Sequence, residues 1–209
     1  MVLRLGEALG VGLRERNQLL QAAGLAPAYP QADLGGHDLA PYRAVLDRLL
    51  NAHMPYPAMV VDSHWTVMMA NAACARLYGI DVVGVNLIRM YVTDPAARQT
   101  VVNWAEVAWA GLDRLHQQLD RAPFDETLAD LIREADASMA GLARPREPSA
   151  EPVMCPWFRV GEQVIKTIGV AARFDPVVDV TLDELRVELT YPLDDIADRF
   201  FRGALTADK

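Results

Sequence analysis

The segment that decides the fold is residues 58–71, Ala58-Met59-Val60-Val61-Asp62-Ser63-His64-Trp65-Thr66-Val67-Met68-Met69-Ala70-Asn71. Two apolar runs, 58–61 and 65–70, flank a turn-like segment, and this pattern predicts a β-hairpin. Asn71 is well placed to cap a helix over residues 72–78, because its side chain can accept a backbone N–H of the first turn. Gly79 is expected to end that helix. The segment therefore predicts strand, turn, strand and helix in succession.

Helical patterns precede this hairpin, with an aperiodic segment between them. Residues 3–9 and 13–23 are each predicted to be helical and each ends at glycine. Residues 26–38 contain prolines and glycines without periodicity, which is typical of a linker. A helix is predicted over 39–51, where one apolar stripe is formed by Leu39, Tyr42, Val45, Leu46, Leu49 and Leu50.

The longest predicted element follows the hairpin. A short helical turn is expected over 86–91, and then Asp94 as N-cap and Pro95 at the first position would open a helix that runs to Arg121. Its apolar stripe recurs at steps of three and four residues and consists of Val101, Trp104, Ala108, Leu112, Leu115 and Leu119. A further helix is predicted over 126–137, and the proline-containing segment 144–152 is expected to be a loop.

The C-terminal third changes to the two-residue period of strands. Strands are predicted over 153–160 and 163–174, joined by a turn at 161–162. Thr181 and Glu184 resemble a capping box, but the alternation from Leu185 onward favours one helical turn followed by a strand. The order of elements predicts an α+β fold, with an antiparallel five-stranded sheet and helices gathered on one face.

Composition and charge exclude several classes of protein. The chain is 52% hydrophobic and carries a net charge of -8 with a pI of about 5.0. Duplex binding depends on clustered Lys and Arg, so this chain alone is expected to bind nucleic acid poorly. No signal peptide or membrane span is predicted, and the isolated Cys74 and Cys155 fit a reducing, cytoplasmic location.

The sequence does not favour catalysis. Serines are scarce and none lies in a G-x-S-x-G motif, and the four histidines form no H-x-x-x-H pair. No catalytic residue and no metal site is therefore predicted. His53 and His64 lack a haem-binding motif around them, so no cofactor is expected either.

Several blocks of sequence resemble known families. Residues 61–73 resemble the opening of a PAS domain, in which two strands end in an Asn that starts a helix. The wider pattern resembles the MmyB-like transcription regulators from about residue 39 to 192. The blocks that carry this resemblance, in order, are Pro55-Tyr56-Pro57-Ala58, Asn86-Leu87-Ile88-Arg89, Asp94-Pro95, Val101-Val102-Asn103-Trp104 and Asp179-Val180-Thr181-Leu182-Asp183-Glu184-Leu185-Arg186-Val187-Glu188-Leu189.

The resemblance implies a bacterial regulator in which an XRE-type helix-turn-helix precedes a PAS-like ligand-binding domain. Residues 1–25 look like the last helices of such a DNA-binding domain, 26–38 like the linker, and 39–205 like the sensor. The recognition helix that enters the major groove has no counterpart here, so the chain is truncated, begins late, or is a sensor without a DNA reader. DNA would be bound only through those missing helices. The resemblance also implies a fatty-acid-like ligand. A homodimer is expected because operators are usually read by two-fold pairs.

The residues expected to line a ligand cavity come from the elements that a PAS-like fold wraps around its interior. The methionines among them suit ligands of variable shape. For any one of them alone the pattern favours a role in the core, and only as a group do they support a cavity equally well. The predicted ligand-binding residues are Met59, Val61, Met68, Leu77, Met90, Trp104, Ala108, Met154, Trp157, Val187 and Leu189. The candidates for holding a ligand carboxylate are Arg89, Arg98 and Arg159, because guanidinium groups bind carboxylates in a bidentate manner.

Three hypotheses follow. In the first, a small hydrophobic molecule binds between sheet and helices and shifts the regulator between DNA-binding states, with residues 39–52 as the coupling element. In the second, the PAS-like domain is a dimerisation or protein-interaction module without a small-molecule ligand. The third, an enzyme of unrecognised type, requires a polar constellation that the sequence does not reveal.

Overall fold

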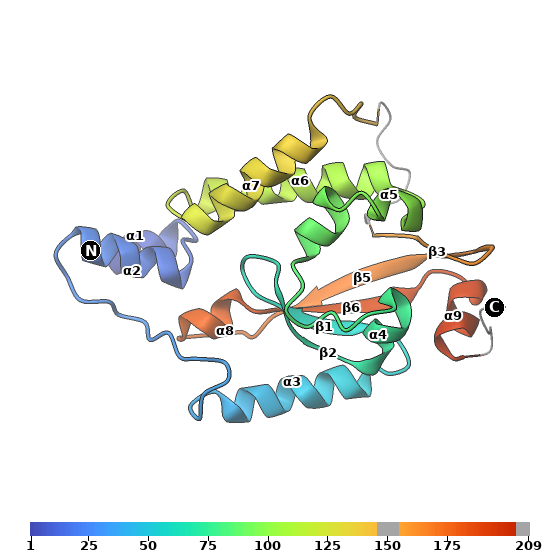
Figure 1. Cartoon of the computed structure of the whole chain (residues 1–209). Helices are drawn as coiled ribbons and strands as arrows, with labels where there is room; N and C mark the ends of the chain where they lie inside the picture. The colour runs from blue at the N-terminus through green and yellow to red at the C-terminus, as the bar shows by residue number, and fades with distance from the viewer. Residues whose placement is uncertain (146–154, 204–209) are drawn as a thin grey trace.

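The structure, a computed structural model, describes residues 1–145 and 155–203. An antiparallel four-stranded sheet lies at the centre, and helices surround it (Figure 1). The helices are α1 (Val2–Ala8), α2 (Leu13–Ala22), α3 (Ala40–Ala52), α4 (Ala72–Tyr78), the π-helix η1 (Arg89–Thr93), α5 (Ala97–Thr100), α6 (Trp104–Arg121), α7 (Glu126–Met139), α8 (Val180–Glu184) and α9 (Asp195–Phe201). The strands are β1 (Ala58–Val61), β2 (Val67–Ala70), β3 (Phe158–Val160), β4 (Gln163–Ile165), β5 (Thr167–Ala172) and β6 (Arg186–Pro192).

The predicted α+β class is confirmed, but the single five-stranded sheet is wrong. The main sheet has four strands in the order β2-β1-β6-β5, and β3 and β4 form a separate two-stranded sheet. The predicted strand over 163–174 divides at Lys166, because residues 163–165 pair with β3 whereas 167–172 pair with β6. At this division the Thr167 hydroxyl donates to the Pro156 carbonyl at 2.6 Å. One stretch of sequence thus supplies strands to two sheets.

The expectation that helices cover only one face of the sheet is also wrong. Figure 1 shows α6 and α7 on one side of the main sheet and α3 on the other. All four residues of β1 are buried. Met59 and Val61 pack with the α6–α7 layer, and Ala58 and Val60 pack with α3. A central strand buried on both faces has a continuous apolar run instead of alternation, as residues 58–61 do.

The long helix predicted from Pro95 is broken in two. α5 ends at Thr100 and α6 begins at Trp104, because Val101 between them is extended and the following residues bond to the segment before β3. Val102 donates its backbone N–H to the Trp157 carbonyl at 2.8 Å, and the Asn103 side chain bonds to backbone atoms of Cys155 and Trp157, both at 2.9 Å. These long-range bonds override the local helical pattern.

The predictions around the hairpin and at the start of β6 are confirmed. Asn71 caps α4 by accepting the Cys74 N–H, and Gly79 ends α4 with a φ of 71°. One helical turn, α8, precedes the alternating strand β6, but its N-cap is Asp179 and not Thr181. The final helix, α9, was not expected from the sequence, and Asp194 caps it by accepting the Ala197 N–H at 2.9 Å.

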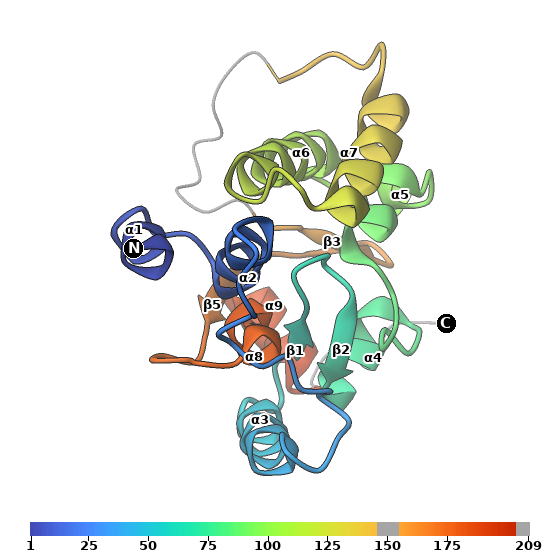
Figure 2. The same cartoon turned by 90° about the vertical axis from the view of Figure 1, so that its left-hand side faces the viewer.

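The N-terminal helix α2 lies against α8, the helical turn that precedes β6. Figure 2, with its view turned by 90°, shows α2 in front of α8, and the contacts between them are specific. The Arg14 guanidinium pairs with Glu184 at 2.5 Å, and the Leu13 N–H donates to Asp183 at 3.3 Å. Within residues 26–38 there is no helix or strand, yet the Val180 N–H donates to the Pro30 carbonyl at 2.9 Å. The segment before α3 is therefore held to α8.

Candidate functional site

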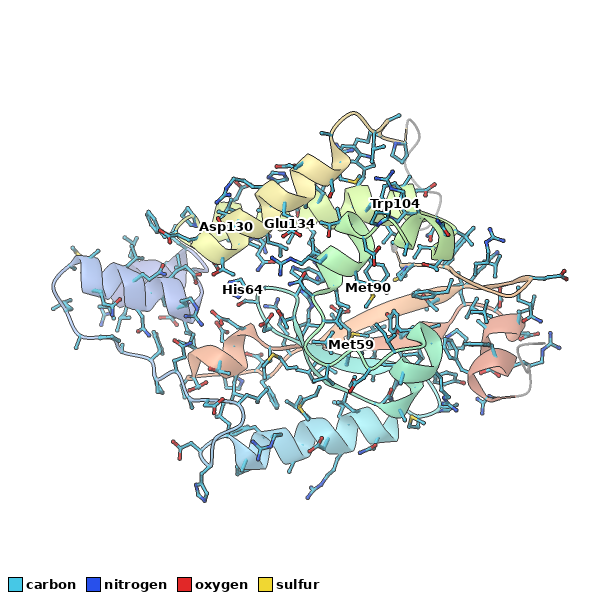
Figure 3. The ribbon with its side chains drawn as sticks, viewed as in Figure 1. Met59, His64, Met90, Trp104, Asp130 and Glu134 are labelled. Atoms are coloured by element: carbon cyan, nitrogen blue, oxygen red, sulfur yellow. The ribbon has the colours of Figure 1, made fainter. Side chains whose placement is uncertain are left out.

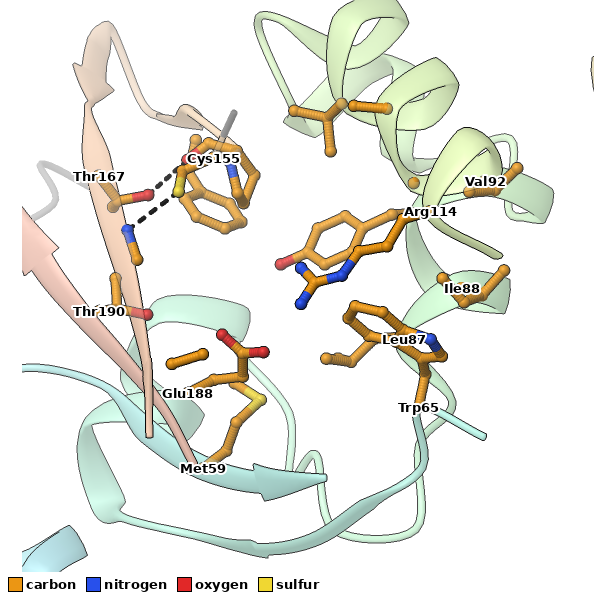
Figure 4. Close-up of a pocket in the computed structure, with 18 of the residues that line it drawn as sticks. Met59, Trp65, Leu87, Ile88, Val92, Arg114, Cys155, Thr167, Glu188 and Thr190 are labelled. Carbon is orange, nitrogen blue, oxygen red and sulfur yellow. Dashed lines mark hydrogen bonds between the residues drawn. The ribbon is translucent and has the colours of Figure 1, made fainter. Parts of the chain in front are cut away.

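A cavity of about 480 Å³ lies between the helical layer and the main sheet. Its helical side is formed by α6 and η1, and its other side by β1, β5, β6 and the segment before β3 (Figure 4). The residues that line it are Met59, Trp65, Tyr78, Leu87, Ile88, Tyr91, Val92, Val107, Ala110, Gly111, Arg114, Cys155, Pro156, Phe158, Thr167, Gly169, Ala171, Glu188 and Thr190. A volume of this size and a largely apolar lining are typical of small-molecule sites.

Small residues that face each other leave this space open. Ala110 and Gly111 are on the cavity side of α6, and Gly169 and Ala171 are on β5 opposite. Gly169 and Ala171 point to the same side because side chains alternate along a strand, and their partners across the ladder on β6 are Thr190 and Glu188. Both layers therefore border the cavity with small residues at this level.

The glycine in α6 leads to a prediction about stability. Gly111→Ala is expected to raise the free energy of unfolding by about 0.5–1 kcal/mol, since glycine in a helix interior costs about that much relative to alanine. A Cβ at this position would meet only the Val92 Cγ2 at 3.8 Å, an ordinary contact. Urea unfolding of both proteins measures the difference.

The control for the unfolding measurement on Gly111→Ala is the variant Gly169→Ala. There a Cβ would lie 3.3 Å from the Cys155 Sγ, so no stabilisation is expected. Equal effects of the two substitutions, or a loss of stability at Gly111→Ala, would show that the void at α6 is smaller than the structure indicates.

Trp65 is held in the cavity by an unusual backbone conformation. Its φ is 67°, the left-handed region that bulky residues rarely adopt. The indole N–H donates to the Gln118 side chain at 3.1 Å, and the ring is 8% exposed. Backbone conformations of this kind cost about 1–3 kcal/mol and are concentrated at ligand-binding sites. The turn between β1 and β2 thus directs an aromatic ring at the cavity.

The polar groups of the cavity are few. The Tyr78 and Tyr91 hydroxyls bond to each other at 2.7 Å, and burial raises the pKa of both, which keeps them neutral. Glu188 and Thr190 come from β6, and Arg114 comes from α6 (Figure 4). An apolar space with a few convergent polar groups favours binding of an amphipathic molecule.

The cysteines are poor nucleophiles here. Burial raises the pKa of the Cys74 thiol to about 11 and also raises the pKa of the Cys155 thiol, so neither is a thiolate near neutral pH. The Cys155 Sγ accepts the Gly169 N–H at 2.9 Å. Among the described residues, no group of three or more His, Cys, Asp or Glu side chains is arranged to hold a metal ion.

The predicted ligand-binding residues differ in how they lie relative to the cavity. Met59 lines it. Val61 and Ala108 are buried in the same hydrophobic cluster as Met59, and Met90 and Trp104 pack against that cluster (Figure 3). Leu77 lies in the neighbouring cluster around Phe158, Met68 is 38% exposed, and Trp157 stacks under the Lys166 ammonium at 4.8 Å. Met154 lies outside the described residues.

Val187 and Leu189 are on the opposite face of the sheet from the cavity. They pack with α3, in the cluster that contains Leu46 and Leu50. The sequence predicts the alternation along β6, but because both faces of the sheet are covered, alternation alone does not indicate which face borders the cavity. The residues of β6 that reach the cavity are the polar ones, Glu188 and Thr190.

The three arginines predicted to hold a carboxylate lie away from the cavity lining. Arg89 pairs with Glu134 at 2.9 Å on the surface, Arg98 stacks on the Trp104 ring at 4.6 Å, and Arg159 is exposed on β3. Among the described residues, the arginine that lines the cavity is Arg114, which is not one of the three predicted.

A second stripe on α6 could have identified the cavity side. Val107, Ala110, Gly111 and Arg114 are spaced i, i+3, i+4 and i+7, which places them on one face of the helix. The predicted apolar stripe lies on the neighbouring face of α6 and packs with α7. It includes Ala108, Leu112 and Leu115. Small residues together with one charge at helical spacing were the signal for a cavity.

Comparison with known proteins agrees with this geometry. Residues 42–203 match the family described as MmyB-like transcription regulator ligand binding domain, which covers the sheet, the cavity and α3 to α9 almost completely. The chain belongs to this family. The family is that of a ligand-binding domain of transcription regulators, and the cavity lies inside the matched region.

Two further findings accompany the MmyB-like assignment. A search of curated proteins found no match. Within the described part of the chain, no helix combines the length and the apolar character needed to cross a bilayer.

Proposed function

We propose that this MmyB-like domain is the ligand-sensing part of a bacterial XRE-type transcription regulator and that it is not an enzyme. The ligand is a small hydrophobic molecule, for which a long-chain fatty acid is the first candidate. The observation that carries the proposal is the cavity of about 480 Å³ between α6 and the sheet, whose lining is aromatic and aliphatic except for a few polar groups. Without a ligand, water in the cavity would contact several aromatic rings, and a bound hydrophobic molecule would cover them.

The proposal also assigns roles to the segments of the chain. Residues 1–25 belong to the DNA-binding side, 26–38 form the linker and 39–205 form the sensor. The regulator works in the cytoplasm as a homodimer, because operators are usually bound by two-fold pairs. DNA is contacted by helices of the XRE type outside this chain, since the chain itself carries a net charge of -8.

β6 is the element best placed to couple the ligand to the N-terminal segment. It presents Glu188 to the cavity and Val187 to α3, and α8, directly before it, holds α2 through the Arg14–Glu184 ion pair at 2.5 Å. If β6 can occupy two placements and the ligand binds more tightly when β6 is in one of them, ligand binding would shift both α3 and the docked N-terminal helices. The coupling element proposed for residues 39–52 is thereby extended to α8.

The test is to identify what the purified protein carries. Mass spectrometry of an extract of the denatured protein is expected to reveal a co-purified hydrophobic molecule. A thermal-shift titration with fatty acids of increasing chain length is expected to stabilise the protein, by about 2.7 kcal/mol when the ligand is at 100 times its dissociation constant. An empty extract together with no shift at any chain length would instead favour the alternative, an interaction module without a ligand.

A further inference from the structure

Two arginines from opposite layers of the fold meet at the ring of Trp65. The Arg114 guanidinium, from α6, is 4.8 Å from the ring centroid, and the Arg186 guanidinium, from β6, is 3.9 Å from it. Arg186 lies two residues before Glu188, so alternation along β6 directs it to the cavity side of the sheet. In Figure 4 the Arg114 side chain points from α6 toward the sheet, opposite Glu188 and Thr190.

Arg186 is buried and only partly satisfied. Its side chain is 9% exposed and its Nε pairs with a Glu188 oxygen. Its Nη2 is buried and has no hydrogen-bond partner among residues 1–145 and 155–203. Burial lowers the pKa of this guanidinium, but arginine remains charged near neutral pH. A buried donor without an acceptor is costly. The free nitrogen therefore marks a position where an acceptor belongs.

The charges around Trp65 are unbalanced. Within the part of the chain that the structure describes, Glu188 is the carboxylate that pairs with Arg186. In the described ranges no carboxylate forms an ion pair with Arg114. Arg173 is a further positive charge near Arg186. This end of the cavity therefore has an excess of positive charge next to an apolar space.

We propose that Arg114 and Arg186 together bind the carboxylate of an amphipathic ligand whose tail occupies the cavity between α6 and β5. One carboxylate oxygen accepts from the free Nη2 of Arg186 and the other from Arg114, while Glu188 stays on the Nε of Arg186. Guanidinium groups suit such planar, charge-assisted bonds. The proposal rests on the proposed ligand-sensing function and adds to it the residues that select an acid over a neutral molecule.

The experiment uses the whole chain and two matched pairs of probes, decanoic acid with decanamide and 2-naphthoic acid with 2-naphthamide. Within each pair the tail is the same, so the difference in dissociation constant measures recognition of the head group. Calorimetric titration of the unsubstituted protein is expected to show the acid binding about tenfold more tightly or better in at least one pair. Arg114→Met is expected to reduce that preference, because it weakens binding of the acid more than binding of the amide.

The control variant is Arg121→Met, which removes an exposed arginine from the last turn of the same helix, outside the cavity lining. It is expected to retain the preference for the acid. Arg114 is itself exposed, so its substitution does not threaten folding as a change at the buried Arg186 would. A thermal unfolding curve of each variant verifies that the fold is intact.

The outcomes separate the two proposals. Equal binding of acid and amide by the unsubstituted protein, or a preference of the same size in Arg114→Met, would overturn the arginine site and leave the ligand-sensing function standing. Binding of no probe, together with an empty extract from the purified protein, would overturn the ligand-sensing function and the arginine site with it.

Discussion

Ala110→Phe is expected to weaken ligand binding by about tenfold or more without unfolding the protein. Ala110 lines the cavity from α6, where it and Gly111 face Gly169 and Ala171 across the gap. A phenyl ring at this position would occupy the space between the two layers. Filling a void does not carry the strain of inserting the same ring into a packed core. The measurement is the amount of co-purified ligand and the affinity for added decanoic acid.

The matched control is Gln117→Phe, which adds the same ring to an exposed position of the same helix, outside the cavity lining. It is expected to bind like the unsubstituted protein. The stability of Ala110→Phe without ligand should equal or exceed that of the unsubstituted protein, because new apolar contacts form in the gap. Unchanged ligand binding by Ala110→Phe would show that the ligand occupies some other part of the molecule.

Local patterns in the sequence predicted the elements whose partners are close along the chain. The hairpin of β1 and β2, the cap and end of α4, and the turn of helix before β6 all depend on residues within a few positions of one another. Elements decided by distant residues were not predictable in this way. The break before α6 depends on bonds from residues 102 and 103 to backbone at 155 and 157, which no local pattern reveals.

The candidate site was predicted less well than the fold, for a physical reason. The predicted set consists mainly of large apolar side chains, which in a folded protein mostly fill space, as Met90 and Trp104 do against the core around Leu112. A cavity arises where side chains are small. Gly111 and Gly169 mark it, and Arg114 and Glu188 border it. Of the predicted set, Met59 lines the cavity directly.

The buried side chain of Asn71 holds three parts of the fold together, and Asn71→Ala is expected to cost about 2–4 kcal/mol of unfolding free energy. Its Oδ1 accepts the N–H groups of Ala58 at 3.2 Å and Cys74 at 3.3 Å. Its Nδ2 donates to the carbonyls of Leu50 at 3.0 Å and Tyr56 at 2.9 Å. The side chain thereby links the end of α3, the start of β1 and the first turn of α4.

Alanine at this position would remove all four bonds and leave buried backbone groups without partners, which costs more than the bonds themselves contribute. Asp194→Ala is the comparison, because Asp194 caps α9 with a single bond and is only half-buried; the expected cost there is about 1 kcal/mol. Urea unfolding of both variants measures the difference. Equal costs would mean that Asn71 acts as an ordinary helix cap, and that the position of β1, which brings Met59 to the cavity, is set by apolar packing alone.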